Sequence, residues 1–408
     1  MSSIEETPAV TPSRAAFALV FVTVVLDMLA LGIMIPVLPK LVIAMSHGDI
    51  AHAASVTGVF GFAWAAMQFV FSPVVGALSD RYGRRPIILM SNFGLGADYV
   101  LMALAPILPW LFVGRIISGI TSSSFPTASA YIADVTPKER RAESYGKLGA
   151  AFGLGFIVGP ALGGVLGQID LRLPFWVAAG LSLANAAYGC FVLPESLPEE
   201  RRAKVKWHLA NPFGSLALLR SSPVLLGLAG ALLLYQLAHD SLPSVYVLYA
   251  TYRYAWTERD VGLSLAVVGV CSTVVQAAMI GPMVKRFGER KALLLGLLFG
   301  VVGFGVYGIA TTGALFLVGI PFMALWGLAG PSMQALMSHK VSAEEQGRLQ
   351  GAMSSVMGIT GMLAPLLFTQ VLRGAIDEGH AAYLPGAPFV LAAVLLGLSF
   401  LWSLRVAR

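Results

Sequence analysis

The sequence predicts an all-α membrane protein with twelve transmembrane helices arranged in two six-helix, pseudo-symmetric halves. Of the 408 residues, 57% are hydrophobic and only 12% are charged, which is about half the charge of a typical soluble domain. The apolar residues form repeated runs of about twenty or more, the length of helix that crosses roughly 30 Å of hydrocarbon. Such continuous runs differ from the alternating pattern of membrane strands, so a β-barrel is excluded.

The individual spans follow from these runs, and almost every run contains Gly or Pro. The segment before the first span, MSSIEETPAVTPSR, lacks the basic start and the small-residue cleavage site of a signal peptide, so we expect the first span to stay in the mature protein. The predicted spans cover residues 15–39, 53–78, 86–108, 110–133, 146–168, 173–193, 223–249, 259–281, 291–311, 314–337, 348–372 and 384–404.

The orientation of the chain follows from its Lys and Arg residues, because cytoplasmic loops carry the excess of both. Of the 27 cationic residues, 21 lie on the side of the two termini, and Arg115 lies within a span. We therefore expect both termini to be cytoplasmic. The net charge of +6 is spread over many short loops and forms no patch that could follow a phosphate backbone, so we expect no nucleic-acid partner.

The chain repeats itself on either side of its longest polar stretch, residues 194–215. We therefore divide it into an N-terminal six-helix half at 1–193, a cytoplasmic linker at 194–222 and a C-terminal six-helix half at 223–408. Two similar halves are typical of transporters, whose substrate site lies between the halves near the membrane midplane. The residues that recur 205 positions later pair Gly76 with Gly281, Gly83 with Gly288, Arg85 with Arg290, Glu139 with Glu344, Gly146 with Gly351, and Pro160 with Pro365.

The loop GALSDRYGRRP is a candidate for gating. Gly76 permits a tight turn at a helix end, while Asp80 and Arg84 can form charged bonds to a neighbouring helix. Asp134, at the end of the fourth span, is the expected partner of Arg84. A cluster that forms in only one conformation would act as a latch for that conformation. The alternative is that the arginines of this loop only obey the positive-inside rule.

The run GLGFIVGPALGG is a second candidate for gating. Its small residues, Gly159 among them, allow another helix to pack closely, and Pro160 removes a backbone hydrogen bond and can kink the span. Rocking of two halves would use such a contact. The alternative is ordinary packing between helices with no gating role.

Few ionisable side chains lie within or close to the spans: Asp27, Asp98, Arg115 and the pair His239 and Asp240. An ionised carboxylate at the bilayer centre costs at least about 2.5 kcal/mol, so such groups normally face a cavity or a partner, and proton-driven transporters use them to carry protons. The structural alternative for Asp27 is a helix-interface acid bonded to Ser or Thr. The structural alternative for Arg115 is that it merely neutralises a buried acid.

No pattern of catalytic or metal-binding residues is present. Cys190 and Cys271 lie in apolar spans and give neither a disulfide framework nor the spacing of metal ligands. The six histidines are scattered, and we find no nucleophile constellation or cofactor-binding loop. We therefore expect no enzyme activity, no metal site and no cofactor.

Several motifs together resemble the major facilitator superfamily. GALSDRYGRRP is similar to its loop signature, and RIISGITSSSFPTASAYIAD and GLGFIVGPALGG resemble its fourth-span and fifth-span motifs, the latter associated with antiporters. Within that superfamily, LDMLALGIMIPVLP, AAMQFVFSP, ADYVLMAL and PSVYVLY are similar to the bacterial tetracycline efflux pumps. The resemblance implies that Asp27, Gln68 and Asp98 contact substrate or coupling ion and that Arg115 is required.

Two positions depart from that family. Ser272 stands where the family carries a His in the eighth span, and Gly300 stands where it carries an Asp in the ninth. His239 and Asp240 are unusual for the family and could replace these two groups. Alternatively, they form a satisfied pair at a helix kink before Pro243.

The predicted function is therefore a proton-coupled efflux antiporter that exports amphiphilic drugs by alternating access, with tetracyclines as candidate substrates. Proton-linked transport of a different metabolite or nutrient is the alternative. We expect a location in the bacterial cytoplasmic (inner) membrane and a role in drug resistance. The expected partners are a small-molecule substrate, protons and the lipid bilayer, with the chain working as a monomer. The proton is the coupling ion, and the substrate can carry a divalent metal.

Overall fold

A computed structural model describes residues 14–122, 124–136, 140–202, 214–342, 345–376 and 384–406, and every regular element within these ranges is a helix. The prediction of an all-α fold is confirmed. The α-helices are α1 (Arg14–Met34), α2 (Leu38–Met45), α3 (Ile50–Tyr82), α4 (Arg84–Leu104), α5 (Leu108–Thr121), α6 (Ser124–Val135), α7 (Arg141–Ile169), α8 (Leu173–Val192), α9 (Pro223–His239), α10 (Ser241–Tyr254), α11 (Glu258–Val274), α12 (Ile280–Phe287), α13 (Glu289–Ile309), α14 (Gly313–Trp326), α15 (Ala329–Ser338), α16 (Gln346–Ile376) and α17 (Ala387–Val406). Short 3-10 helices lie at η2 (Glu199–Arg201) and η4 (Gly214–Arg220), and a π-helical turn, η5 (Val275–Met279), joins α11 to α12.

Among the described residues, eleven helical stretches are long and apolar enough to cross a membrane. The span predicted at 110–133 is divided between two helices, because α5 ends at Thr121 and α6 begins at Ser124. Pro126 falls in the first turn of α6, where its missing N–H removes no helical hydrogen bond, whereas it would break a longer helix. The spans predicted at 15–39, 223–249 and 314–337 are also interrupted, at residues 35–37, 240 and 327–328.

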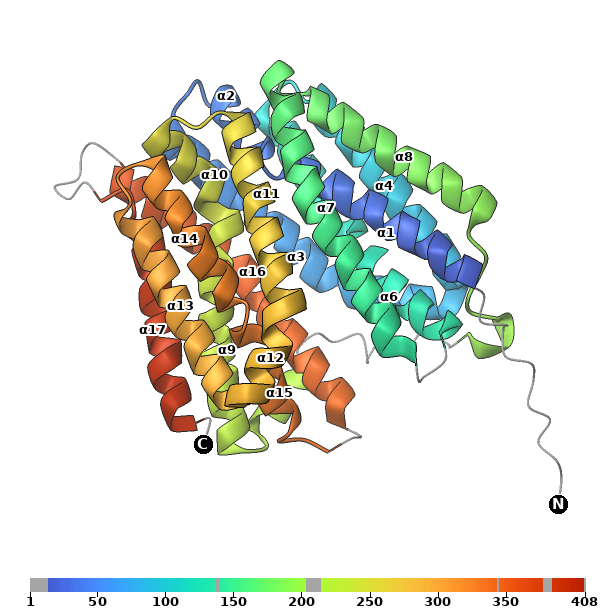
Figure 1. Ribbon diagram of the computed structural model, residues 1–408. Coiled ribbons are helices and arrows are strands. Elements are labelled where there is room, and N and C mark those ends of the chain that lie inside the picture. The colour runs from blue at the N-terminus through green and yellow to red at the C-terminus, as the bar shows by residue number, and fades with distance from the viewer. Residues whose placement is uncertain are drawn as a thin grey trace.

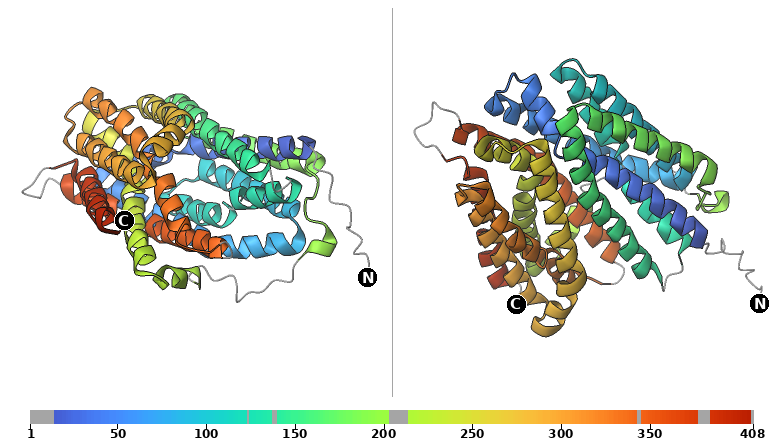
Figure 2. Two further views of the ribbon diagram at one scale, coloured as in Figure 1. Left: turned by 60° about the horizontal axis from the view of Figure 1, so that its bottom comes forward. Right: turned by 45° about the horizontal axis from the view of Figure 1, so that its top comes forward.

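The helices form two groups that lie side by side (Figure 1). In the first group, α1 to α8, α1 contacts α7 and α8, α4 contacts α8, and α3 contacts α5. In the second group, α9 to α17, α13 contacts α14 and α17, and α9 contacts α17. Figure 2 shows the same groups from two further directions. We call the end where α1 begins, at the right of Figure 1, and where α17 ends, at its bottom, the terminal end, and the opposite end the distal end.

The repeat of 205 residues recurs in the bounds of the helices. Helices α4 and α13 begin at Arg84 and Glu289 and both contain 21 residues, while α5 and α14 both contain 14. Gly83 and Gly288 precede α4 and α13 with φ angles of 103° and 78°. Residues with a Cβ are strained at such angles, so both turns require glycine.

The two groups contact each other through α7 and α11 and through α3 and α16. A Cβ added to Gly164 of α7 would lie 3.0 Å from the Cα of Gly262 in α11. A Cβ added to Gly61 of α3 would lie 2.7 Å from the Cβ of Pro365 in α16. The absence of side chains at these positions therefore lets helices of different groups approach closely.

The groups meet at the distal end and separate toward the terminal end (Figure 1). At the distal end, Lys40 of α2 forms an ion pair with Glu258 of α11 at 3.7 Å. Arg373 of α16 donates a hydrogen bond to Ser55 Oγ of α3 at 3.3 Å. Toward the terminal end, α12 contains no buried residue. Contacts between the groups are thus concentrated at the distal end.

Replacing Gly159 by Ala tests the close contact between α7 and α1. The new Cβ would lie 2.7 Å from the Cα of Gly32, so one of the two helices must move. We expect a loss of roughly 1–3 kcal/mol in the free energy of unfolding, measured by thermal denaturation in detergent. Gly149→Ala on the same helix is the control, because no described residue lies within 4 Å of its added Cβ. Equal stability of the two variants would contradict the close contact.

Candidate functional site

A buried carboxylate lies where three helices of the first group meet. Asp27 of α1 is 4% exposed. Asn185 of α8 donates from Nδ2 to Asp27 Oδ1 at 2.8 Å and to the carbonyl oxygen of Thr23 at 2.9 Å. Asn92 of α4, with its amide nitrogen facing Asp27, donates to both carboxylate oxygens at 3.1 and 3.2 Å. We call Asp27, Asn92 and Asn185 the Asp27 cluster.

The Asp27 cluster lies inside the first group, since its partners come from α4 and α8. Two amide donors can stabilise an ionised carboxylate without a cation. Sequence reasoning expected Ser or Thr as structural partners and missed Asn92 and Asn185. The signal was present in the sequence, because an Asn inside an apolar span needs a buried partner.

A second buried acid lies between α4 and α5. Asp98 is fully buried, and both of its oxygens lack a hydrogen-bond partner of normal geometry among the described residues. A Cβ on Gly114 of α5 would lie 2.8 Å from Asp98 Oδ1, so a glycine is needed beside this carboxylate. Arg115 interacts electrostatically with Asp98, and its Cζ lies 5.3 Å from the centre of the Trp64 ring on α3.

Gln68 lies on α3, the helix that also carries Trp64, and donates to Ser122 Oγ at 3.5 Å. The structure thus places Gln68, Asp98 and Arg115 on neighbouring helices α3, α4 and α5. Asp27 has separate partners on α4 and α8. The first-group residues predicted to contact substrate or coupling ion therefore lie in two places: Asp27 among α1, α4 and α8, and Gln68, Asp98 and Arg115 on α3, α4 and α5.

His239 and Asp240 belong to the second group, at the break between α9 and α10. Gln236 Nε2 donates to Asp240 Oδ1 at 3.0 Å, and His239 Nδ1 lies 3.3 Å from the same oxygen. Asp240 Oδ2 is buried and has no partner within the described parts of the chain. The pair is therefore only half satisfied. Ser272 lies in α11, three residues before the π-helical turn η5.

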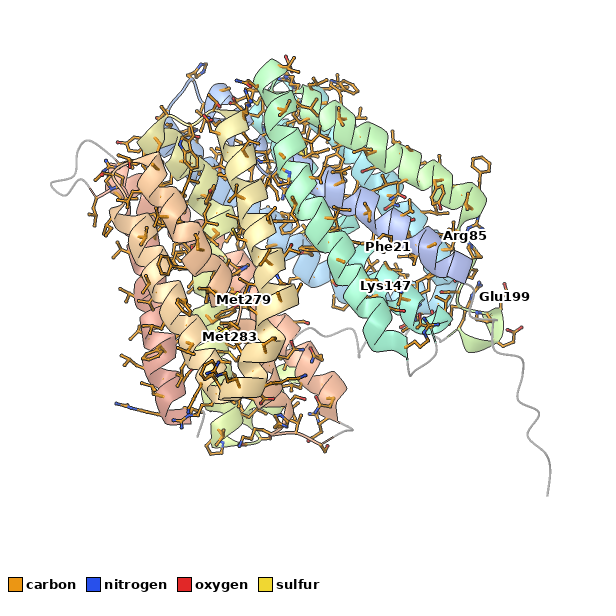
Figure 3. All side chains as sticks on the ribbon, viewed as in Figure 1. Phe21, Arg85, Lys147, Glu199, Met279 and Met283 are labelled. Carbon is orange, nitrogen blue, oxygen red and sulfur yellow. The ribbon has the colours of Figure 1, made fainter. Side chains whose placement is uncertain are left out.

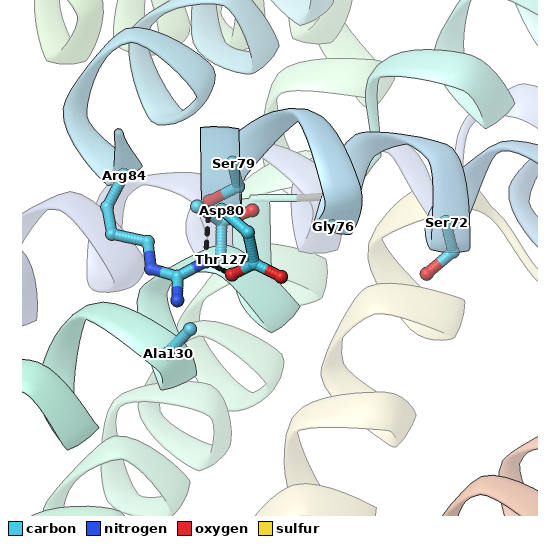
Figure 4. Close-up of a pocket in the computed structure, with 7 residues that line it drawn as sticks. All are labelled: Ser72, Gly76, Ser79, Asp80, Arg84, Thr127 and Ala130. Atoms are coloured by element: carbon cyan, nitrogen blue, oxygen red, sulfur yellow. Dashed lines mark hydrogen bonds and ion pairs between the residues drawn. The ribbon is translucent and has the colours of Figure 1, made fainter. Parts of the chain in front are cut away.

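The segment predicted to gate contains a charged cluster at the terminal end of the first group. It is not a loop along its whole length: Gly76 and Asp80 lie within α3, so the turn expected at Gly76 is wrong, and the chain turns at Gly83 instead. Arg84 NH1 forms an ion pair with Asp80 Oδ1 at 2.6 Å and donates to Ser79 Oγ at 3.0 Å, while Nε pairs with Asp134 Oδ2 at 3.1 Å. Figure 4 shows Arg84 directed toward Asp80 and Ser79 beside a cavity of about 200 Å³, which Gly76 also lines. These bonds join α3, α4 and α6, all within the first group.

Glu195, which sequence reasoning did not single out, caps the N-terminus of α4. Its Oε1 accepts from the N–H of Arg84 at 2.8 Å, and its Oε2 accepts from the N–H of Arg85 at 3.2 Å. Oε1 also accepts from the N–H groups of Ser196 and Leu197 at 2.9 and 3.0 Å. An anion is favoured at a helix N-terminus. The signal was an acidic residue directly after the sixth apolar run.

The capping segment continues the same charged cluster. Ser196 Oγ donates to Asp134 Oδ2 at 3.1 Å, and Tyr131 OH donates to the carbonyl oxygen of Pro194 at 3.0 Å. Figure 3 shows Arg85 and Glu199 at this end of the first group. The segment that follows α8 is therefore tied to α4 and α6. We call Asp80, Arg84, Asp134 and Glu195 the terminal-end cluster.

The glycine-rich run of α7 contacts two helices at once. Gly159 packs against Gly32 of α1, while the carbonyl oxygen of Pro160 would lie 2.4 Å from a Cβ on Gly262 of α11. One face of α7 is thus packed within the first group and another against the second. Within the described residues, no three His, Cys, Asp or Glu side chains gather as metal ligands.

The apolar helices and buried ionisable clusters define a multi-pass membrane transporter. The chain matches the Major Facilitator Superfamily over residues 20–365, with a second match over 228–407. It is 36% identical to tetracycline resistance protein class C of Escherichia coli over 383 residues, 94% of this chain and 96% of that protein. It is 33% identical to the class B protein of Escherichia coli, over 93% and 94% of the two chains. The chain therefore belongs to the Major Facilitator Superfamily and is a transporter, not an enzyme.

Solved structures share the fold. The nucleoside transporter NupG has a TM-score of 0.77 at 12% identity and covers 96% of this chain and 99% of its own. The human organic anion transporter MFSD10 has a TM-score of 0.70 at 23% identity, with 96% and 99% covered.

Glu195→Gln tests the cap of α4. The amide keeps the size of the side chain but loses the charge and half of the acceptors, so we expect a loss of roughly 1 kcal/mol in stability. Amide hydrogen exchange at Arg84 and Arg85 should become faster. Glu199→Gln is the control, because the Glu199 side chain is 83% exposed and pairs only with Arg202 in the described segment. Unchanged exchange in Glu195→Gln would exclude Glu195 as the cap.

Proposed function

We propose that this chain is a proton-coupled efflux antiporter that exports amphiphilic drugs, tetracyclines among them, across the bacterial inner membrane. The observation that carries the proposal is the 36% identity to a tetracycline resistance protein along nearly the whole of both chains. The other tetracycline resistance proteins with which this chain shares 30–36% identity favour the same substrate class over a different metabolite or nutrient.

The proposed architecture has twelve spans in two six-helix halves, residues 1–193 and 223–408, joined by a linker at 194–222. The repeated bounds of α4 and α13 support this division. Helices α5 and α6 together make the proposed fourth span. Residues 203–213 of the linker lie outside the described residues. The distribution of Lys and Arg supports a cytoplasmic location for the linker and both termini.

Alternating access is the proposed mechanism of transport. The contacts between the groups at the distal end, with separation toward the terminal end, are what a state open to the cytoplasm requires. We propose two sets of gating residues. Gly76, Asp80, Arg84 and Asp134 lie at the helix ends that would move, and Gly159 and Pro160 lie where α7 contacts α1 and α11. A transition to the outward-open state would separate Lys40 from Glu258.

Proton coupling is assigned to the buried ionisable groups of the first group. Among the described residues, Asp98 has no hydrogen-bond partner of normal geometry, so it is costly when ionised and can take up a proton from an aqueous path. Arg115 supplies the opposing charge, and Asp27 is the second proposed acid. Gln68, His239 and Asp240 are assigned to the substrate. No cofactor takes part; protons, the lipid bilayer and a substrate that can carry a divalent metal are the partners of a functional monomer.

Everted membrane vesicles energised by respiration test the proposal. Wild-type vesicles should accumulate radiolabelled tetracycline, and a protonophore should abolish the accumulation. Asp27→Asn keeps the size of the side chain but removes its charge, so we expect normal insertion with no uphill accumulation.

Asp170→Asn is the matched control, because Asp170 accepts from the N–H groups of Arg172 and Leu173 in an exposed turn. It should accumulate tetracycline at the wild-type rate. Wild-type accumulation that persists with protonophore would refute proton coupling, and full activity of Asp27→Asn would remove Asp27 from the coupling site.

A further inference from the structure

A carboxylate, Asp240, lies at the break between α9 and α10, and one of its oxygens has no hydrogen-bond partner among the described residues. Asp240 Oδ1 accepts from Gln236 and lies 3.3 Å from His239 Nδ1, whereas Oδ2 is buried and has no partner within the described residues. The Asp240 side chain is 14% exposed. A buried acceptor in this condition is costly unless a ligand, water or proton satisfies it.

Aromatic rings from two helices stand beside this carboxylate. The Trp326 ring, at the end of α14, lies 5.2 Å from the Tyr235 ring and 5.5 Å from the His239 ring, measured between centroids. His239 is thus in contact with both the acid and the indole. Trp326 Nε1 is also buried without a hydrogen-bond partner in the described parts of the chain.

The position of Trp326 depends on a glycine in the neighbouring helix. A Cβ added to Gly300 of α13 would lie 2.7 Å from Cδ1 of Trp326. A carboxylate on α13 at this position is therefore incompatible with the indole as placed. The second group instead carries its acid at Asp240, beside His239, whose ring contacts the indole.

His239 indicates that this cluster faces water. Its side chain is 48% exposed, although the residue lies in the middle of the apolar stretch Pro223–Tyr254. Exposure of a polar ring to the hydrocarbon midplane would be costly, and such residues normally face the bundle interior or a water-filled path. A solute in that path would meet the His239 ring first, since Trp326 is 4% exposed and Asp240 Oδ2 is buried.

We propose that Tyr235, His239, Asp240 and Trp326 form a binding site for organic cations. A quaternary or protonated tertiary amine, or a phosphonium, would place its charge at Asp240 Oδ2 and its apolar groups on the rings of Tyr235 and Trp326. Ring faces attract such cations, and the attraction is strongest when water is excluded. The inference rests on the proposed function, because it assigns the cationic part of the exported substrate to the second group.

Direct binding to the purified full-length chain in nanodiscs tests the site without any proton gradient. The probes are radiolabelled tetraphenylphosphonium and tetraphenylborate, which have nearly the same shape and opposite charge. We expect tetraphenylphosphonium to bind at least about tenfold more tightly than tetraphenylborate. Equal affinity for the two ions would overturn the proposal.

Matched variants locate the site. Asp240→Asn should lose about tenfold in tetraphenylphosphonium affinity. Glu289→Gln should not, although Glu289 also pairs with a histidine, His339, at 3.1 Å. Trp326→Leu should weaken binding at least about fivefold, whereas Trp402→Leu, at a side chain 51% exposed on α17, should not. If Trp326→Leu is not recovered folded, Tyr235→Leu tests the other aromatic ring of the proposed site.

The outcomes separate this inference from the proposed function. Selective binding that depends on Asp240, in a protein whose vesicles show no protonophore-sensitive transport, would support the cation site and refute the antiporter. Active transport by the wild type together with unchanged tetraphenylphosphonium affinity in Asp240→Asn would refute the cation site and support the antiporter.

Discussion

The free-energy cost of placing a charge inside an apolar helix bundle determines where the buried polar residues of this protein lie and which partners they have. An ionised side chain there requires donors, an opposite charge or a path to water. Asp27 meets the requirement with the amides of Asn92 and Asn185, which tie α1 to α4 and α8. Asp98 and Asp240 meet it only in part, since buried carboxylate oxygens remain without a hydrogen-bond partner of normal geometry among the described residues. Such groups are the ones that can change state when a proton or ligand arrives.

Small residues set how closely the helices of the two groups approach one another. Helix α7 packs closely against α1 at Gly159 and against α11 at Gly164, so it approaches helices of both groups through its backbone. Its Pro160 carbonyl lies close to Gly262, at the same contact. A rotation of one group against the other must therefore move these closely packed helices past each other at glycine positions.

Fold class and repeat could be predicted from the sequence, because they depend on composition and on residue spacing. The offset that pairs Gly83 with Gly288 corresponds to two turns with positive φ. The partners of Asp27 could not be predicted, because they depend on how three helices are rotated about their axes. The break between α5 and α6 had a signal in the sequence, the polar run TSSS before Pro126, which the assignment of a single span did not use. Glu195 was missed because its role depends on a turn that folds back onto α4.

The two groups repeat in their helix bounds and differ in their chemistry. The first contains the buried acids Asp27 and Asp98 and the terminal-end cluster; at the place of Asp80, the repeat has Lys285. The second places Asp240 beside His239, whose ring contacts Trp326. Under the two proposals, the proton and the cationic substrate occupy different groups. Coupling between them must then come from both ligands favouring one arrangement of the groups, since neither site requires contact with the other. The α7–α11 and α3–α16 contacts, which join the groups, are where that shared preference would be expressed.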